Sequence, residues 1–124
     1  MQPLYIIKGV VIKGKERGRR LGFPTANIKL DKNIPDGIYI SEVFISDKNY
    51  KATTFVGIAK TFHETKYFLE SYILDFNEII YGKEITVKLY EKIRKNIKFA
   101  SEELLIAQIK NDVEYTRRFF SLHQ

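Results

Sequence analysis

The stretch EITVKLYEKI, residues Glu84 to Ile93, alternates cleanly between polar and apolar side chains. Ile85, Val87 and Leu89 fall on one face, and polar residues occupy the other face. A period of two is typical of an antiparallel strand that buries one face and exposes the other to water. This stretch therefore predicts a sheet that packs one of its faces on an apolar core.

Segments on either side of this stretch carry similar signals. Runs rich in Ile, Val and Tyr predict further strands at Leu4 to Lys13, Ile38 to Ser46, Tyr50 to Ile58 and Tyr67 to Leu74, with a short one at Ile28 to Leu30. Gly9 inside the first run suggests a bulge or a close backbone approach. After the strands, Ser101 is predicted to cap a helix whose apolar residues recur at helical spacing as far as Phe120. Since no helix separates consecutive strands, we expect a small closed antiparallel barrel capped by a C-terminal helix.

The length and composition limit the class of protein. A chain of 124 residues fits one domain, which we expect to span residues 1–124. The absence of cysteine excludes disulfides, thiolate zinc sites and a cysteine nucleophile. No apolar run reaches the length of a membrane span, and Met1-Gln2-Pro3 does not begin a signal peptide. We therefore expect a cytoplasmic protein without a membrane partner.

The chain is basic, with a formal net charge of +6 and a pI of about 9.4. Such a balance favours anionic partners such as a nucleotide or nucleic acid. The basic residues gather in two groups: Lys13, Lys15, Arg17, Arg19 and Arg20, and then Lys92, Arg94, Lys95 and Lys98. Solvated loop surface explains both groups equally well.

One stretch within the first basic group has the composition of an anion site. The sequence GRRLGFPTAN, residues Gly18 to Asn27, combines two glycines, two arginines and the short oxygen-bearing side chains of Thr25 and Asn27. Glycine lets a backbone approach a ligand closely, and arginine supplies a permanent planar charge. We expect residues 14 to 27 to form a long functional loop that binds phosphate or a nucleotide.

Two other known kinds of site do not fit. Residues Gly9 to Glu16 nearly match a phosphate-binding loop, but Glu16 replaces the required hydroxyl and no helix follows. His63 and His123 lack companions at metal-ligand spacing, so we expect surface histidines and no protein metal cage. Magnesium could still arrive with a nucleotide, because it takes few protein ligands.

Glu70 is the acid that we single out. Period two places it on one face of its strand with Phe68, Tyr72 and Leu74. It is either a glutamate at the barrel rim without a chemical role, or a partly buried acid. Partial burial would raise its pKa and make it a better proton acceptor near neutrality.

The stretch Gly18 to Asn27 resembles the signature of riboflavin kinases, including the kinase module of bifunctional bacterial FAD synthetases. Three further segments resemble that family in order and spacing: Gly37-Ile38-Tyr39; Glu70 with Ile73-Leu74-Asp75-Phe76 and Tyr81-Gly82; and Ile93-Arg94, Lys98-Phe99, Leu104, Ile109 and Asp112. The similarity runs from about Gly9 to Asp112. It implies a six-stranded Greek-key barrel with a C-terminal helix, and transfer of the ATP γ-phosphate to the riboflavin 5′-hydroxyl to give FMN and ADP.

The resemblance also implies roles for single residues. Glu70 would accept the proton of the ribityl hydroxyl, while Thr25 and Asn27 would hold Mg²⁺, with Mn²⁺ or Zn²⁺ as alternatives. The ATP phosphates would lie against Gly14, Gly18, Arg19 (or Arg20), Gly22, Pro24, Thr25 and Asn27. Arg94 and the segment to Phe99 would close over the flavin ring.

The chain departs from the family pattern at three places: Phe55-Val56-Gly57, Lys60-Thr61-Phe62, and Asn96 where an acid is usual. It also lacks an FMN adenylyltransferase module, so it would be either a stand-alone kinase or an excised domain. Two alternatives stay open. One is a flavin- or nucleotide-binding module without catalysis. The less favoured one is a nucleic-acid-binding β-barrel, which would present aromatic and basic residues together on an exposed strand face.

Overall fold

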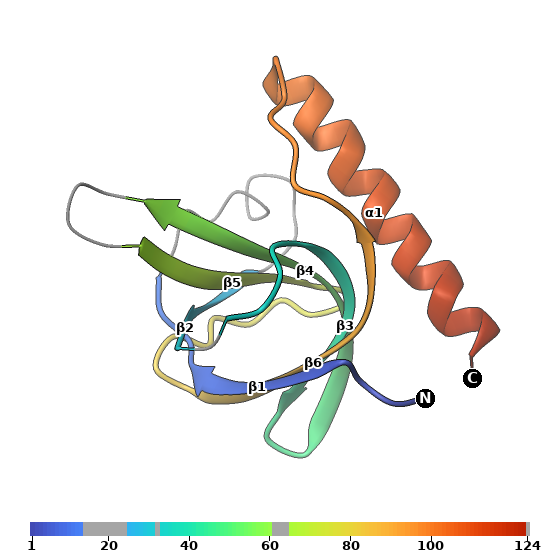
Figure 1. Ribbon diagram of the computed structural model, residues 1–124. Helices are drawn as coiled ribbons and strands as arrows, with labels where there is room; N and C mark the ends of the chain where they lie inside the picture. The colour runs from blue at the N-terminus through green and yellow to red at the C-terminus, as the bar shows by residue number, and fades with distance from the viewer. Residues whose placement is uncertain (14–24, 32, 61–64, 124) are drawn as a thin grey trace.

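The computed structural model describes residues 1–13, 25–31, 33–60 and 65–123, and Figure 1 shows its elements. They are β1 (Tyr5–Val10), β2 (Thr25–Leu30), β3 (Gly37–Ile45), β4 (Lys48–Lys60), β5 (Thr65–Ile73), β6 (Glu84–Arg94) and α1 (Glu102–Leu122). The strands form one antiparallel sheet in the order β1-β6-β3-β4-β5-β2. Within it, β3, β4 and β5 are joined in sequence and β6 returns beside β3, which is the Greek-key arrangement that the resemblance implied.

The sheet curls until its two outer strands approach each other (Figure 1). The residues just after β1 make the contact, because Ile12 pairs with Asn27 of β2 and its backbone N–H donates to the Asn27 carbonyl at 2.8 Å. The sheet is therefore a nearly closed barrel. Gly9 faces β2 at close range, since a Cβ atom there would lie 2.5 Å from Ile28 Cγ2. The predicted close backbone approach at Gly9 is confirmed.

Every second side chain of each strand points into the barrel. Ile85, Val87 and Leu89 are at most 1% exposed and belong to the main core, as the alternation of their stretch predicts. The interior is not wholly apolar, because the hydroxyl of Thr54 lies in hydrogen-bonding contact with those of Ser41 and Ser71. These three buried side chains come from three adjacent strands and satisfy one another.

Some predicted strand limits were wrong. The first strand ends at Val10, and the hairpin turn is Ser46–Asp47, where Ser46 adopts φ of 55°, and not Asp47 to Asn49. The largest error concerns β2, which begins at Thr25, so Thr25 and Asn27 lie in a strand and not in a loop. The reason is the pairing of β2 with β5 over its full length, which places Ala26 in the same buried core as Ile28 and Leu30.

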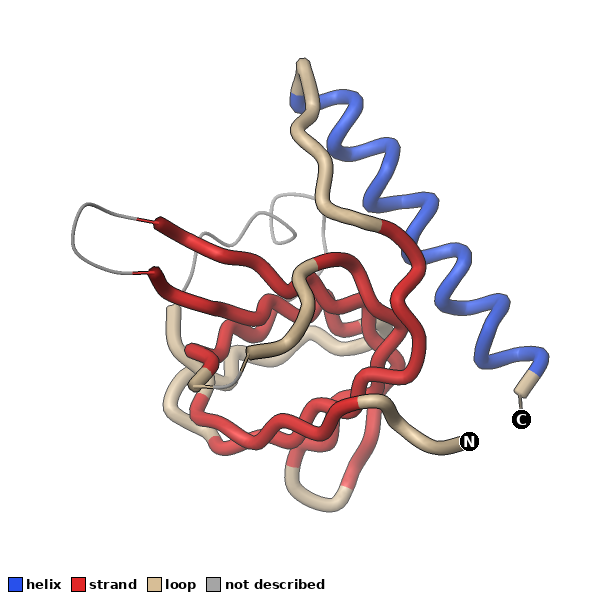
Figure 2. The backbone as a smooth tube through the Cα atoms, viewed as in Figure 1, coloured by secondary structure: helices blue, strands red, loops and turns tan. Residues whose placement is uncertain are grey.

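Helix α1 packs on the outside of the barrel, against β3 and β4 (Figure 2). Ser101 caps it as predicted, because its side chain accepts a hydrogen bond from the Leu104 N–H. A second apolar cluster, formed by Tyr72, Leu74, Ile109 and Val113, lies between the helix and the sheet. Among the described residues, no helix combines the length and the apolar character needed to cross a membrane.

Candidate active site on the outer face of the barrel

One row of side chains crosses five adjacent strands on the outer face of the barrel. In strand order it consists of Arg94, Ile38, Phe55, Glu70 and Asn27, each the register partner of the next. We call these five residues the outer row. Since neighbouring strands lie about 4.8 Å apart, the row extends over roughly 19 Å. It connects Arg94, next to the helix, with Asn27, on the opposite side of the sheet.

The residues of the outer row face away from the barrel interior, because their sequence neighbours Ala26, Val56 and Leu69 belong to the core. Glu70 and Asn27 are nevertheless buried, with 3% and 6% of their surfaces exposed. The burial of Glu70 confirms the second of the two alternatives for this acid and excludes an exposed glutamate at the rim. Its role as a base stays a prediction.

The β2 end of the row holds the short oxygen-bearing side chains. Asn27 lies directly opposite Glu70, and Thr25 lies two residues earlier on the same face, opposite Tyr72. The Nδ2 atom of Asn27 is buried and has no hydrogen-bond partner in the described part of the chain. A buried amide without a partner costs free energy, which a bound acceptor such as a phosphate oxygen would offset.

The side chains at the β2 end also fit a magnesium site. No group of three His, Cys, Asp or Glu within residues 1–13, 25–31, 33–60 and 65–123 could hold a metal by itself. A hydroxyl and an amide oxygen on one strand face nonetheless suit Mg²⁺, which binds hard oxygen ligands and keeps most of its contacts for phosphate and water. Thr25 and Asn27 therefore fit a metal that is bound together with a nucleotide.

The helix end of the row opens into a cavity of about 710 Å³. Its floor is the outer face of β3 to β6, and its other walls are the segment 95–101 and the first half of α1. The apolar lining includes Ile38, Phe55, Tyr72, Phe99 and Ile109. A cavity of this size and character accommodates a cofactor-sized molecule with a flat aromatic ring.

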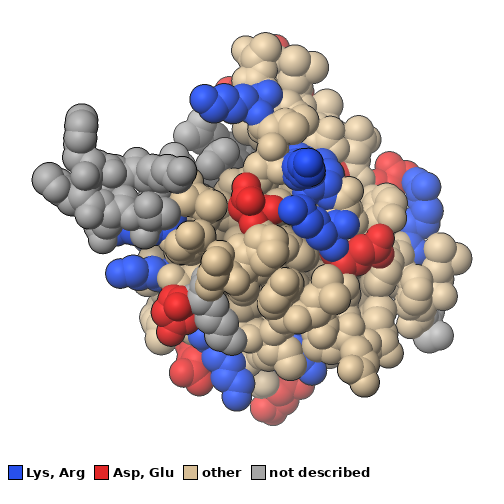
Figure 3. All heavy atoms as spheres, in the orientation of Figure 1, with Lys and Arg blue, Asp and Glu red and all other residues tan. Residues whose placement is uncertain are grey.

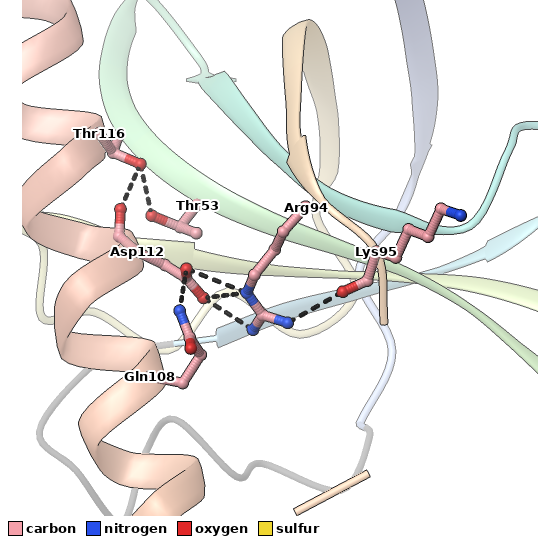
Figure 4. A network of polar contacts seen from close by, with 6 residues as sticks. All are labelled: Thr53, Arg94, Lys95, Gln108, Asp112 and Thr116. Atoms are coloured by element: carbon pink, nitrogen blue, oxygen red, sulfur yellow. Dashed lines mark hydrogen bonds and ion pairs between the residues drawn. The ribbon is translucent and has the colours of Figure 1, made fainter. Parts of the chain in front are cut away.

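A partly buried ion pair joins the cavity floor to the helix (Figure 4). Arg94, at the end of β6, donates from Nη2 to Asp112 Oδ2 at 2.8 Å and from Nε to Asp112 Oδ1 at 3.1 Å. Gln108 adds a bond of 3.0 Å to the same carboxylate. The remaining edge of the guanidinium donates from Nη1 to the Lys95 carbonyl at 3.1 Å. Arg94 thus lines the cavity, and most of its donors already hold protein groups. Its predicted contact with a flavin stays a prediction.

Two threonines make a second connection between helix and sheet (Figure 4). The Thr116 hydroxyl donates to the Asp112 carbonyl at 2.9 Å, so the Thr53 hydroxyl donates to Thr116, also at 2.9 Å. From the sequence, Asp112 was predicted only as part of the family pattern, and neither threonine was predicted to have a role. The available signal was their spacing, because Asp112 and Thr116 lie among Ile109, Val113 and Phe120 on the buried face of the helix.

The residues of the second basic group differ in their exposure. Lys92, Lys95 and Lys98 are exposed, whereas Arg94 is turned inward onto Asp112. Figure 3 shows basic side chains in the middle of one face with acidic side chains beside them. Among the described residues, the exposed aromatics are Tyr81 and Tyr115, and neither lies in a strand. The aromatic side chains of the strands that are not buried, such as Phe44, Phe55 and Phe68, are only half-exposed.

Several predicted site residues fall outside the described part of the chain. These are Gly14, Gly18, Arg19, Arg20, Gly22 and Pro24, together with His63 and two residues of the Lys60-Thr61-Phe62 departure. Of the predicted residues that are described, the structure brings Thr25, Asn27 and Glu70 together at one end of the row. It places Arg94 and Phe99 together at the cavity, with the guanidinium 5.8 Å from the centre of the Phe99 ring.

Comparisons with known proteins show what the chain is similar to. The family described as Flavokinase (riboflavin kinase) matches residues 1–120. The bifunctional riboflavin kinase/FMN adenylyltransferase of Listeria monocytogenes is 40% identical over 121 residues, which are 94% of this chain and 38% of that protein. The solved structure of riboflavin kinase from Trypanosoma brucei superposes with a TM-score of 0.69 at 27% identity, covering 98% of this chain and 82% of that one.

A second solved structure, named as a macrolide-efflux protein from Streptococcus pneumoniae, has a TM-score of 0.84 and 40% identity. The match covers 93% of this chain and 38% of that one. The chain spans between 19% and 40% of the length of three curated relatives that it matches. The shared region is therefore one part of longer proteins.

Proposed function

The chain belongs to the riboflavin kinase family, and from this premise we propose that it transfers the γ-phosphate of ATP to the 5′-hydroxyl of riboflavin, giving FMN and ADP. The observation that carries the proposal is the outer row. It joins a largely apolar cavity to a buried carboxylate, with a hydroxyl and an amide immediately beyond. A flavin needs the first feature, and phosphoryl transfer needs the other two.

The row suggests how the substrates are arranged. The isoalloxazine ring occupies the cavity between β3 to β6 and α1. The ribityl chain then runs along the row past Phe55, so that its terminal hydroxyl reaches Glu70. The ATP phosphates approach from the β2 side, where Asn27 offers its buried amide. This arrangement places the nucleophile and the γ-phosphate side by side, and positioning supplies most of the catalysis in phosphoryl transfer.

Glu70 acts as the general base in this proposal. Its carboxylate accepts the proton of the riboflavin 5′-hydroxyl while that oxygen bonds to the γ-phosphorus. The bond between the γ-phosphorus and the bridging oxygen breaks, and ADP leaves with the electron pair. A positioned base of this kind contributes about 10²–10⁴ in rate. The register partners Phe55 and Asn27 hold Glu70 from both sides.

Thr25 and Asn27 would hold the metal with their side-chain oxygens. Mg²⁺ supplies charge neutralisation between the phosphates, and Mn²⁺ and Zn²⁺ are alternatives for the same ligands. Gly14, Gly18, Arg19, Gly22 and Pro24 remain predicted phosphate contacts. We expect the reaction in the cytoplasm, where ATP is available, and we propose that residues 1–124 act as one domain.

The test is a direct assay. Residues 1–124, purified and incubated with riboflavin, ATP and Mg²⁺, should produce FMN and ADP in equal amounts. Quenching of flavin fluorescence without turnover, across metals and pH, would instead identify a non-catalytic flavin-binding module. Salt-dependent binding of single-stranded nucleic acid without any flavin binding would contradict both functions.

A further inference from the structure

The segment 95–101, between β6 and α1, forms one wall of the cavity, and Asn96 ties this segment to the sheet. Its Nδ2 atom donates to the Val56 carbonyl at 3.0 Å and to Asp36 Oδ2 at 3.3 Å. Asn96 itself lines the cavity. One amide group thus connects the wall to β4 and to the turn that precedes β3.

The barrel fixes the Val56 acceptor, and it holds the backbone next to the exposed Asp36. Val56 is fully buried and belongs to the main core. Asp36 follows Pro35, whose carbonyl accepts a hydrogen bond from the buried Tyr39 hydroxyl at 2.5 Å. Burial, with smaller contributions from Tyr5 and Asp36, raises the pKa of Tyr39, which keeps this hydroxyl protonated as a donor. The amide of Asn96 is therefore anchored at the rigid Val56 carbonyl and has a second, exposed contact at Asp36.

The backbone brings these parts together just before Asn96. Gly37 begins β3 with φ of +148°, and a Cβ atom there would lie 2.9 Å from the Arg94 carbonyl oxygen. Only glycine permits this contact without strain. The close approach fixes the point at which the segment 95–101 leaves the barrel, and the Asn96 amide then fixes its course over the next residues.

We propose that Asn96 is a positioning residue for flavin binding, which holds the segment 95–101 so that Phe99 and its neighbours form the wall of the cavity. This inference rests on the proposed function of the cavity. In this chain, position 96 acts through its amide donor, because a carboxylate there would have no proton to donate to the two acceptors. It would also place a negative charge against the Val56 carbonyl and the Asp36 carboxylate.

The helix side of the segment has its own attachment. Arg94 holds the Lys95 carbonyl and is itself bound to Asp112 on α1. Loss of the Asn96 bonds should therefore loosen the cavity wall without detaching the helix. The turn at Asp36 leads into β3. The β2 end of the outer row lies three strands away from β3 in the sheet. Nucleotide binding should consequently be independent of Asn96.

The test is the substitution Asn96→Asp, with Asn77→Asp at an exposed position as a matched control. Fluorescence titration should give a Kd for riboflavin that is about tenfold or more above that of the wild type, as expected for the loss of two hydrogen bonds and the gain of a repulsion. The Kd for ADP with Mg²⁺ and the value of kcat at saturating riboflavin should change by less than about threefold. The control should match the wild type in all three.

A second variant tests the contact between Asn96 and Asp36 directly. The double substitution Asn96→Asp with Asp36→Asn restores one donor between the two side chains, so it should recover part of the lost riboflavin affinity. An unchanged Kd for riboflavin in Asn96→Asp would overturn the inference, as would equal losses of flavin and ADP affinity. If Asn96→Asp does not fold, Asn96→Ala gives the same comparison without the charge. Absence of FMN formation by the wild type would contradict the proposed function alone, because the titrations do not depend on turnover.

Discussion

The two ends of the outer row are built by different means. At the β2 end, Asn27 and Glu70 are placed opposite each other by backbone pairing, because each is the register partner of the other in adjacent strands. At the helix end, the cavity depends on side-chain bonds between segments far apart in the chain, of which Arg94–Asp112 and Thr53–Thr116 are the main ones.

Because of this difference, the geometry of the β2 end is fixed, whereas the geometry of the helix end can be changed by losing single bonds. Strand pairing fixes directly opposite Cβ atoms about 5 Å apart, so it sets the spacing of Asn27 and Glu70. The helix end is held by a few polar bonds, and each of them can be lost singly. We therefore expect substitutions at the β2 end to affect the chemical step, and substitutions at the helix end to affect flavin affinity and stability.

The largest effect is expected for Glu70→Gln, which removes the base and preserves the shape of the side chain. Turnover should fall by about 10²–10⁴, because that is the usual contribution of a positioned base. The Kd values for riboflavin and for ADP should stay close to those of the wild type, since the register of β5 with β2 and β4 is unchanged. Steady-state kinetics and fluorescence titration measure the two quantities.

The outcome for Glu70→Gln tests the strand half of the comparison. Unchanged turnover would remove Glu70 from the chemical step. A strong loss of flavin binding would show that this residue maintains the cavity, contrary to its position outside the cavity lining.

Asp112→Ala should have the next largest effect, and it should appear at the helix end. It leaves the Arg94 guanidinium without its carboxylate, and we expect the free energy of unfolding to fall by about 2–3 kcal/mol. Riboflavin affinity should decrease with it, while ADP affinity should not. Denaturant unfolding and the two titrations provide the measurements.

Glu114→Ala is the matched control for this substitution. It breaks an exposed ion pair with Arg118 on the same helix and should cost about 0.5 kcal/mol or less. Similar losses of stability in the two variants would contradict the special role of the partly buried pair.

The same distinction explains what the sequence could predict. The alternation of Glu84 to Ile93 and the cap at Ser101 depend on local patterns, so both were predicted correctly. Glu70 was placed on the correct face of its strand because a strand has a period of two. The pairing of Asn27 with Glu70 could not be derived, because register between strands distant in sequence depends on how the whole barrel closes.

The helix end was less accessible from the sequence. Arg94 and Phe99 were placed at the flavin site by resemblance, but the partners of Arg94 come from a helix that the chain reaches only later. Asp112 looks like an ordinary polar residue until its neighbours on the buried helix face are considered. Asn96 was noticed as a departure from the family pattern, and only the structure supplies its contacts with Val56 and Asp36.

A smaller effect is expected for Thr116→Val, which removes the link between Thr53 and the helix. The Thr53 hydroxyl would lose its acceptor in a buried position, so unfolding should become easier by about 1–2 kcal/mol. Replacing both threonines by valine should cost less than the sum of the two single changes, because no unpaired hydroxyl remains. Additive losses in denaturant unfolding would show that the two hydroxyls act independently.

The smallest effect is expected at the exposed pair of Asp75 and Arg117, which joins the end of β5 to the last part of α1 at 3.1 Å. The hydrogen bonds from Arg117 lower the pKa of Asp75, so the folded state binds this proton less readily than the unfolded chain does. The contribution of the pair to stability is therefore present above the ordinary pKa of aspartate and disappears as the pH falls through the lowered value. Since both side chains are largely exposed, Asp75→Asn should cost no more than about 0.5 kcal/mol at pH 7 and nothing measurable near pH 2. Urea unfolding at the two pH values measures this difference, and a loss that persists in acid would mean that Asp75 stabilises the helix by another contact.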